Sequence, residues 1–380
     1  MPIPLARMLR RGGQEDYTSL VALLKACAQK RDLCKGIKLH ADIAKSGVLD
    51  KSPHLSSMLI TMYAKCGMLV KARVVLEDLP HRNVISWSTI IAGYAQDGQG
   101  HEALLCFEQM RREGLSPNEV TFISLLKACG SICAIDKGEQ IHDEIARRGL
   151  LKTNAVLGNA LVDMYAKCGM LAKAQHVLDE LPVRNVVSWN AMLSAYVDDR
   201  KAEKALQLYR QMQQEGSRPE KLTFVMALQA CAILAEKEGM ISNGRSTKEI
   251  ALEIAKALHK DADMNGYTQD MIVGTTLLGV YGRCGEIMEA EDVFDGLLER
   301  NLVSWTAMLC AYVEQGKAEK ALLLYRHMRN NHEEMHLDSI TFLCVLQSSG
   351  ITGSLELCEE LHFSVISAGY DHISTMQATL

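Results

Sequence analysis

The sequence predicts an all-α fold, a right-handed α-solenoid superhelix of stacked helix-turn-helix repeats. Two observations predict it. A pattern of motifs recurs about every 102 residues, and each repeated unit carries two apolar stripes with helical spacing. A pair of short helices cannot bury such stripes alone, so successive pairs must stack on one another. The alternation of apolar and polar residues that is typical of strands does not compete with this pattern.

The recurring pattern is clearest around the three tryptophans. Trp87, Trp189 and Trp305 lie 102 and 116 residues apart, in motifs that read VISW, VVSW and LVSW. A shorter unit with MYAKCG or VYGRCG precedes each copy, and a third kind of unit follows it and opens TFISLLKAC, TFVMALQAC or TFLCVLQSS. Units of 36, 31 and 35 residues therefore alternate along the chain.

The pattern predicts one solenoid over residues 17–374. Its units are 17–52, 53–83, 84–118, 119–154, 155–185, 186–220, 221–270, 271–301, 302–338 and 339–373. The unit 221–270 carries an insertion near residues 235–246, after which Ser246 and Glu249 are spaced as a capping box that opens its second helix. Residues 1–16 are expected to be a disordered or transit-like N-terminus. Residues 374–380 begin an incomplete final repeat, as in a truncated chain.

Unit 155–185 shows why each unit is expected to fold as two helices. Its two apolar stripes are Leu161, Met164, Tyr165 and Cys168, then Leu171, Ala174, Leu178 and Leu181. Gly169 stands between the stripes, where a left-handed residue ends the first helix without steric cost. Gly67 and Gly285 occupy the matching positions of two other 31-residue units.

Composition limits the other possibilities. The chain has 380 residues, 48% of them hydrophobic, and a formal net charge of −5. It has no apolar run of 18 residues, so we expect no membrane span. Twelve cysteines without a C-x-x-C pair give no zinc site, and they favour a reducing compartment without structural disulfides. Their recurrence in two repeat positions predicts buried packing residues: Cys66, Cys168 and Cys284, and Cys27, Cys129 and Cys231.

No complete catalytic constellation occurs. His142 and Glu144 match the H-x-E part of a zinc deaminase, but the C-x-x-C that would complete the metal site is missing. His40 and His362 recur in the position of His142, which favours a packing role. We therefore expect no enzymatic activity, no metal and no cofactor.

These motifs resemble the pentatricopeptide repeat family of plants over about residues 17–380. The three unit lengths, the SW openings, MYAKCG and TF…LLKAC resemble its PLS subclass, in which long, short and standard-length repeats alternate. We expect the protein to be without the C-terminal E and DYW extensions of that subclass. A tetratricopeptide array also has helix pairs, but its 34-residue period does not give this alternation.

The resemblance implies a sequence-specific single-stranded RNA-binding protein of mitochondrion or chloroplast, which reads about one base per repeat. Its role would be RNA modification, such as recognition of C-to-U editing sites, or RNA processing and stability. We expect a monomer that contacts no membrane, with an editing or processing effector protein acting in trans. A protein-binding helical scaffold and an inactive truncated copy remain as alternatives.

In the resembling family, the fifth and the last residue of a repeat meet the base edge. Here these pairs are Ser57 and Asn83, Ser88 and Asn118, Asn159 and Asn185, Asn190 and Glu220, Thr275 and Asn301, and Thr306 and Asp338. We interpret all of them as small polar residues, with groups suited to reading a base edge. Helix starts also favour such residues as caps, which is a structural reason for the same pattern.

Two further sets of residues are expected to contact the RNA, the first from the resemblance and the second from its recurrence. Apolar second residues separate neighbouring bases, and here they are Ile85, Val156, Val187, Ile272 and Val303, whereas His54 departs. Cations that recur in one position of the 31-residue units would meet phosphates: Lys65, Lys167 and Arg283. The net charge of −5 provides no overall attraction for RNA, so binding would depend on the local surface.

The family's code, carried over to these pairs, implies an RNA of the form A-A-N-Y-Y-N-A-G, 5′ to 3′ from the first 31-residue unit. The 36-residue units have apolar fifth residues, so their positions should be permissive. These residues are Val21, Ile123, Val225 and Leu343.

Overall fold

The computed structural model describes residues 14–45, 53–79, 82–237, 245–331, 337–353, 355–367 and 369. Within these ranges the regular structure consists of α-helices and one 3-10 helix, with no β-strand, so the predicted all-α fold is confirmed. None of the helices described is both long and apolar enough to cross a membrane. The chain divides into two compact halves, residues 1–192 and 193–380.

The N-terminal half holds the first five helix pairs. They are α2 (Gln14–Lys30) and α3 (Leu33–Lys45), α4 (Pro53–Lys65) and α5 (Leu69–Glu77), α6 (Val84–Gln96) and α7 (Gly100–Arg112), α8 (Glu119–Ser131) and α9 (Ile135–Arg147), and α10 (Ala155–Lys167) and α11 (Leu171–Glu180). The 3-10 helix η2 (Leu150–Lys152) precedes α10, and α12 (Val186–Asp198) lies at the boundary between the halves.

The C-terminal half continues the same order. Its helices are α13 (Ala202–Gln214), α14 (Lys221–Glu236), α15 (Thr247–Met264), α16 (Met271–Cys284), α17 (Ile287–Gly296), α18 (Leu302–Glu314), α19 (Ala318–Asn331), α20 (Ser339–Thr352) and α21 (Leu355–Ser367).

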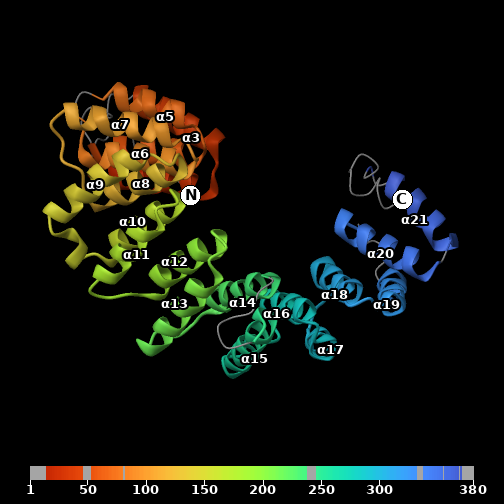
Figure 1. Cartoon of the computed structure of the whole chain (residues 1–380). Coiled ribbons are helices and arrows are strands. Elements are labelled where there is room, and N and C mark those ends of the chain that lie inside the picture. The colour runs from red at the N-terminus through yellow and green to blue at the C-terminus, as the bar shows by residue number, and fades with distance from the viewer. Residues whose placement is uncertain are drawn as a thin grey trace. The chain divides into compact units, whose positions relative to one another are not determined.

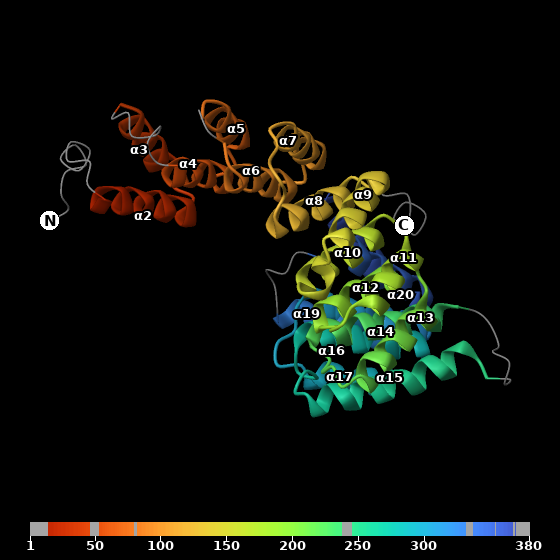
Figure 2. The ribbon, with the colours of Figure 1, turned by 90° about the vertical axis from the view of Figure 1, so that its left-hand side faces the viewer.

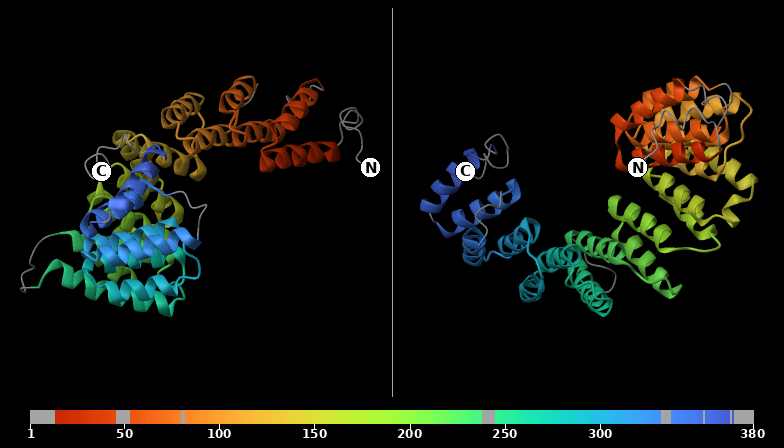
Figure 3. Two further views of the ribbon diagram at one scale, coloured as in Figure 1. Left: turned by 90° about the vertical axis from the view of Figure 1, so that its right-hand side faces the viewer. Right: turned by 180° about the vertical axis from the view of Figure 1, so that it is seen from behind.

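In each half the helices form two layers. In the N-terminal half, α2, α4 and α6 form one layer and α3, α5 and α7 the other (Figure 2), an arrangement that is also visible from the opposite side (Figure 3, left). In the C-terminal half, α14, α16 and α18 follow one another, with α15 and α17 along one side (Figure 1). A first helix packs both on its own second helix and on the first helices of the neighbouring units, as α6 does on α7, α4 and α8.

The turns and caps predicted from the sequence are confirmed. Gly67, Gly169 and Gly285 have φ angles of +76°, +73° and +90°, in the left-handed region that glycine tolerates without steric cost. Ser246 and Glu249 form a capping box at the start of α15.

The N-terminal boundary differs from the expectation. Helix α2 begins at Gln14, whereas residues 14–16 were expected to belong to a disordered start. The sequence there is Gln-Glu-Asp, and Gln and Glu have a good intrinsic preference for helix. Residues 1–13 and 370–380, which include the expected incomplete repeat, lie outside the described part of the chain.

The repeated tryptophans belong to the core. Trp87, Trp189 and Trp305 are each at most 2% exposed. The indole Nε1 of Trp87 donates to Glu113 Oε2 at 2.8 Å, and Glu113 also pairs with Arg82. Tryptophan therefore recurs at this position because it packs in the core. At Trp87 the buried indole N–H also has a polar partner.

Candidate functional site

The last residue of a unit lies at the N-cap of the next first helix. Asn83 Oδ1 accepts from the backbone N–H of Ser86 at 2.8 Å, and Asn118 Oδ1 accepts from that of Thr121 at 2.9 Å. Asn185, Asn301 and Asp338 make the same bond to the third residue of the following helix. These residues therefore cap helices, which by itself is a structural reason for polar residues at this position. One such cap contributes about 1 kcal/mol to stability.

Capping occupies only one end of the asparagine side chain. Backbone N–H groups need an acceptor, so the amide oxygen must face the helix and the amide nitrogen must face away from it. Within the ranges described, the Nδ2 groups of Asn83, Asn118, Asn185 and Asn301 donate no hydrogen bond to the protein. Each therefore keeps donors that a ligand can use.

The fifth residues are less accessible than edge reading alone would require. Ser57, Ser88, Asn190 and Thr306 are buried, and Asn159 and Thr275 are half-buried. The hydroxyl of Ser88 is 2.6 Å from the carbonyl oxygen of Val84, to which it donates, and 2.7 Å from Thr121 Oγ1. The fifth side chain thus lies deeper than the last side chain, and protein groups orient it.

Several predicted pairs are brought together by the stacking of units. Ser88 Oγ is 3.4 Å from Asn118 Oδ1, and Asn159 Nδ2 donates to Asn185 Oδ1 at 3.2 Å. In the C-terminal half, Thr341 links a pair: its hydroxyl is 2.6 Å from Thr306 Oγ1 and donates to Asp338 Oδ1 at 2.6 Å.

The remaining residues of the predicted pairs make other contacts. Thr275 Oγ1 donates to the carbonyl oxygen of Met271 at 2.6 Å. Glu220 is exposed, and its backbone N–H donates to Thr223 Oγ1 at 3.1 Å. Asn190 is buried in the N-terminal half, whereas Glu220 belongs to the C-terminal half.

The apolar second residues lie on the surface. The five predicted residues, Ile85, Val156, Val187, Ile272 and Val303, are 49–62% exposed. The sequence analysis missed three more in the same position of the 36-residue units, namely Val120, Leu222 and Ile340, at 52–56%. They could have been predicted from the sequence, since each is the second residue of its unit. Each half therefore carries four exposed β-branched or leucine side chains in this one repeat position, and exposed apolar groups that recur in this way are typical of an interaction surface.

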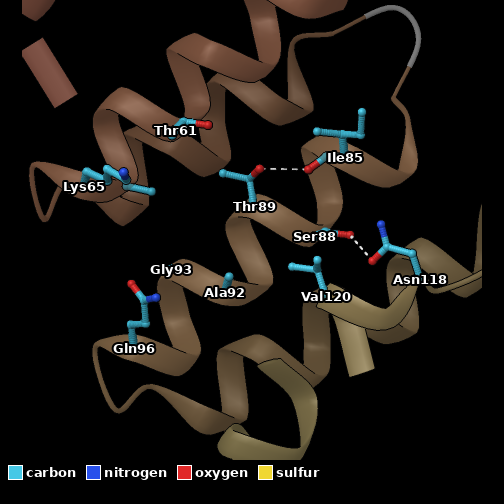
Figure 4. Close-up of a pocket in the computed structure, with 11 residues that line it drawn as sticks. Thr61, Lys65, Ile85, Ser88, Thr89, Ala92, Gly93, Gln96, Asn118 and Val120 are labelled. Atoms are coloured by element: carbon cyan, nitrogen blue, oxygen red, sulfur yellow. Dashed lines mark hydrogen bonds between the residues drawn. The ribbon is translucent and has the colours of Figure 1, made fainter. Parts of the chain in front are cut away.

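A cavity of about 360 Å³ brings these groups together in the N-terminal half (Figure 4). It lies between α4, α6 and the start of α8. Ser88 and Asn118 line it together with the second residues of two successive units, Ile85 and Val120, and with Lys65. The same cavity is therefore lined by residues of every predicted kind: a fifth residue, a last residue, apolar second residues and a cation.

The three predicted phosphate-binding cations differ in their surroundings. Lys65 is exposed and makes no ion pair with any residue described. Lys167 pairs with Asp163 at 2.7 Å, and Arg283 pairs with Glu236 at 3.2 Å. Exposed pairs of this kind contribute little to stability, so a phosphate could replace the carboxylate at small cost.

Two family models match this chain. The one described as the PPR repeat family matches residues 82–131 and 184–233, and the one described as the PPR repeat matches residues 56–84, 159–186, 275–302 and 303–332. Together they cover more than half of the residues. The chain belongs to the pentatricopeptide repeat family.

Two relatives from Arabidopsis thaliana show how far the likeness extends. A chloroplastic pentatricopeptide repeat-containing protein is 35% identical over 346 residues, which cover 91% of this chain and 52% of the relative. A putative mitochondrial pentatricopeptide repeat-containing protein is 32% identical over 342 residues, covering 90% of this chain and 52% of the relative. The chain thus spans about half the length of these relatives.

Among solved structures, the chain is similar to PPR10 from maize. The TM-score is 0.56 at 19% identity, over 95% of this chain and 55% of PPR10. For PPR10 in complex with an 18-nt psaJ RNA element, the TM-score is 0.58 at 17% identity, over 96% of this chain and 58% of that chain. The likeness shows a shared helical-repeat fold.

Two histidines of the predicted packing position have a structural role. His142 Nδ1 is 2.9 Å from Tyr165 Oη, and His40 makes the same contact with Tyr63 at 2.8 Å. Burial lowers the pKa of His142 and raises that of Tyr165 to about 12. His142 is thus held by a tyrosine of the next unit. No group of three metal-ligating side chains occurs in the ranges described.

The two repeated sets of cysteines differ in burial. Cys27, Cys129 and Cys231 are buried as predicted, and burial raises the pKa of all three. The other set, Cys66, Cys168 and Cys284, was also expected to be buried but is only half-buried. Its members stand at the C-terminal end of a first helix, next to a left-handed glycine.

Proposed function

We propose that this chain binds single-stranded RNA in a sequence-specific way in the chloroplast or mitochondrion and reads about one base per repeat. The observation that carries the proposal is the cavity lined by Ser88 and Asn118. It combines a donor-bearing amide, two exposed apolar side chains and a cation, which are the groups needed for a base edge, a base face and a phosphate.

In this proposal the role of each side chain depends on how deeply it is buried. The asparagines that end units present the amide donors, and the fifth residues, which are buried or half-buried, set the shape and polarity behind them. The exposed second residues, Ile85 and Val120 in this cavity, cover the faces of successive bases. Lys65 meets a phosphate, as do Lys167 and Arg283 after exchanging their carboxylate partners.

The family supports the same reading. The relatives named above are chloroplastic or mitochondrial proteins, and PPR10 was solved with an RNA element. We further propose that the chain belongs to the alternating-length PLS subclass, has no catalytic activity of its own and acts as a monomer. An effector protein in trans would then carry out editing or processing at the bound RNA.

Selection from a randomised RNA pool tests the proposal. The purified chain should enrich sequences of the form A-A-N-Y-Y-N-A-G, and binding should weaken as salt rises, because phosphate contacts contribute. Enrichment of no sequence, with the chain folded by circular dichroism, would contradict RNA recognition. Capture of a peptide ligand by the same surface would then support a protein-binding scaffold.

A further inference from the structure

Two cysteines of successive units face each other in the C-terminal half. Cys310 lies on α18 and Cys344 on α20, and their Sγ atoms are 2.9 Å apart. The two helices pack directly on each other. A disulfide has an S–S length of about 2.05 Å, so the sulfurs need to approach by only about 0.9 Å to form one.

The two thiols differ in reactivity. Cys310 is half-buried, whereas Cys344 is 6% exposed. The hydrogen bond from the Cys344 thiol lowers the pKa of Cys310, and the same shared proton raises the pKa of Cys344. Cys310 is therefore the thiol that reaches solvent and forms a thiolate first, and thiolates are the reactive form of cysteine.

We propose that Cys310 and Cys344 form a redox-active dithiol that closes to an intramolecular disulfide on reaction with a low-molecular-weight disulfide such as oxidised glutathione. The Cys310 thiolate attacks one sulfur of the oxidant, which forms a mixed disulfide and releases one small thiol. The Cys344 thiolate then attacks Cys310 Sγ, and a second small thiol leaves. The protein loses two electrons and two protons, and the oxidant gains both.

The position of the pair gives the disulfide a mechanical consequence. Cys310 is the ninth residue of unit 302–338, and Ala92, the ninth residue of unit 84–118, lines the cavity of Figure 4. The cross-link would thus join the first helices of two units at the corresponding face. It closes a loop between positions 34 residues apart, which restricts the unfolded chain and stabilises these two units.

Peptide mapping after oxidation tests the bond itself. Trypsin should release peptide 301–317, which contains Cys310, joined to peptide 330–380, which contains Cys344 and Cys358. Cys358→Ser is the matched control, because it removes the other thiol of the second peptide and should leave the link intact. Cys310→Ser and Cys344→Ser should each abolish it. An unlinked pair in both the wild type and Cys358→Ser after oxidation would overturn the proposal.

Limited proteolysis tests the consequence without any RNA, so its result is separate from that of the proposed function. Thermolysin should cleave within residues 302–369 at least about threefold more slowly after oxidation, because a cross-linked region opens less often. The difference should disappear in Cys310→Ser, whose fold is checked by circular dichroism, and persist in Cys358→Ser. Equal cleavage rates of the linked and reduced forms would show that the disulfide does not stabilise this region.

Discussion

The side chain of Asn118 and the residue Thr121 are joined by two hydrogen bonds: Asn118 Oδ1 accepts from the Thr121 backbone N–H at 2.9 Å and from its hydroxyl at 2.8 Å. The side chain that ends one repeat therefore also starts the first helix of the next. Both bonds use the oxygen, and the nitrogen keeps its donors. Capping and base reading are thus compatible roles of one asparagine.

Exchanging Asn301 for Asp should separate these two roles. Aspartate caps a helix as well as asparagine does, so the bond to the Ser304 N–H is retained. The carboxylate replaces the amide donors with acceptors. We expect the preference at the nucleotide facing Thr275 and Asn301 to move from A toward G by about 1–3 kcal/mol. Competition between two RNAs that differ at this nucleotide measures the change.

The companion variant Asn301→Ala gives the control for stability. It loses the cap and should lower the free energy of unfolding by about 1 kcal/mol, whereas Asn301→Asp should leave it nearly unchanged. If Asn301→Asp still binds RNA with the original preference, the pair does not read a base.

The repeated motifs allowed the fold to be predicted, because Gly169 and the apolar stripes encode the helix pair locally. The site was only partly predictable. The sequence shows an asparagine at position 118 but not which of its atoms caps a helix, nor that Ser88 is buried behind it. Contact between Cys310 and Cys344 depends on the register between two units, which no local pattern specifies.

Thr121 should influence selectivity although it is not one of the predicted reading residues. Its hydroxyl lies 2.7 Å from Ser88 Oγ and donates to Asn118 Oδ1, so it orients both members of the pair. In Thr121→Val the bond from the Thr121 backbone N–H to Asn118 Oδ1 remains, but this orientation is lost, as is the bond that Thr121 Oγ1 accepts from the Asn118 N–H at 3.2 Å. We expect the preference for one base at the facing nucleotide to fall about threefold. This is less than the discrimination that one good base contact provides.

Ser124→Ala is the matched control for Thr121→Val. Ser124 lies on the same helix, is also buried, and donates to the carbonyl oxygen of Val120 rather than to the reading pair. It should retain the selectivity of the wild type in the same four-base comparison. An equal loss in both variants would point to a general effect on α8 instead of an effect on the pair.

Val120→Ser should weaken RNA binding without weakening the fold. The side chain is 56% exposed, so little of its apolar surface contributes to the core. If a base covers it, the variant should lose about 1 kcal/mol of binding free energy for the apolar area no longer buried. Val70→Ser on α5 is the control, since Val70 is 74% exposed and does not line the cavity. Similar affinities of the two variants would argue against a role of Val120 in binding.

Acid should destabilise the repeats through their half-buried histidines. Burial lowers the pKa of His142 in the fold, an effect that the nearby carboxylates Asp143 and Glu180 oppose less strongly. His40 and His259 are shifted in the same direction for the same reason. The unfolded chain therefore binds protons at a higher pH than the folded chain does. Stability should be complete above about pH 6.5 and fall as the pH drops below it toward the folded pKa values.

Exchanging His142 for Gln should remove part of that dependence. Glutamine does not titrate and can still hydrogen-bond the Tyr165 hydroxyl, so the variant should show a shallower fall in the free energy of unfolding between about pH 6.5 and 5. Urea denaturation across this range measures the slope. His101→Gln removes an exposed histidine that belongs to no such pair, and it should keep the slope of the wild type. A slope unchanged in His142→Gln would mean that its protonation is not linked to unfolding, and the acid sensitivity would have to arise from other groups.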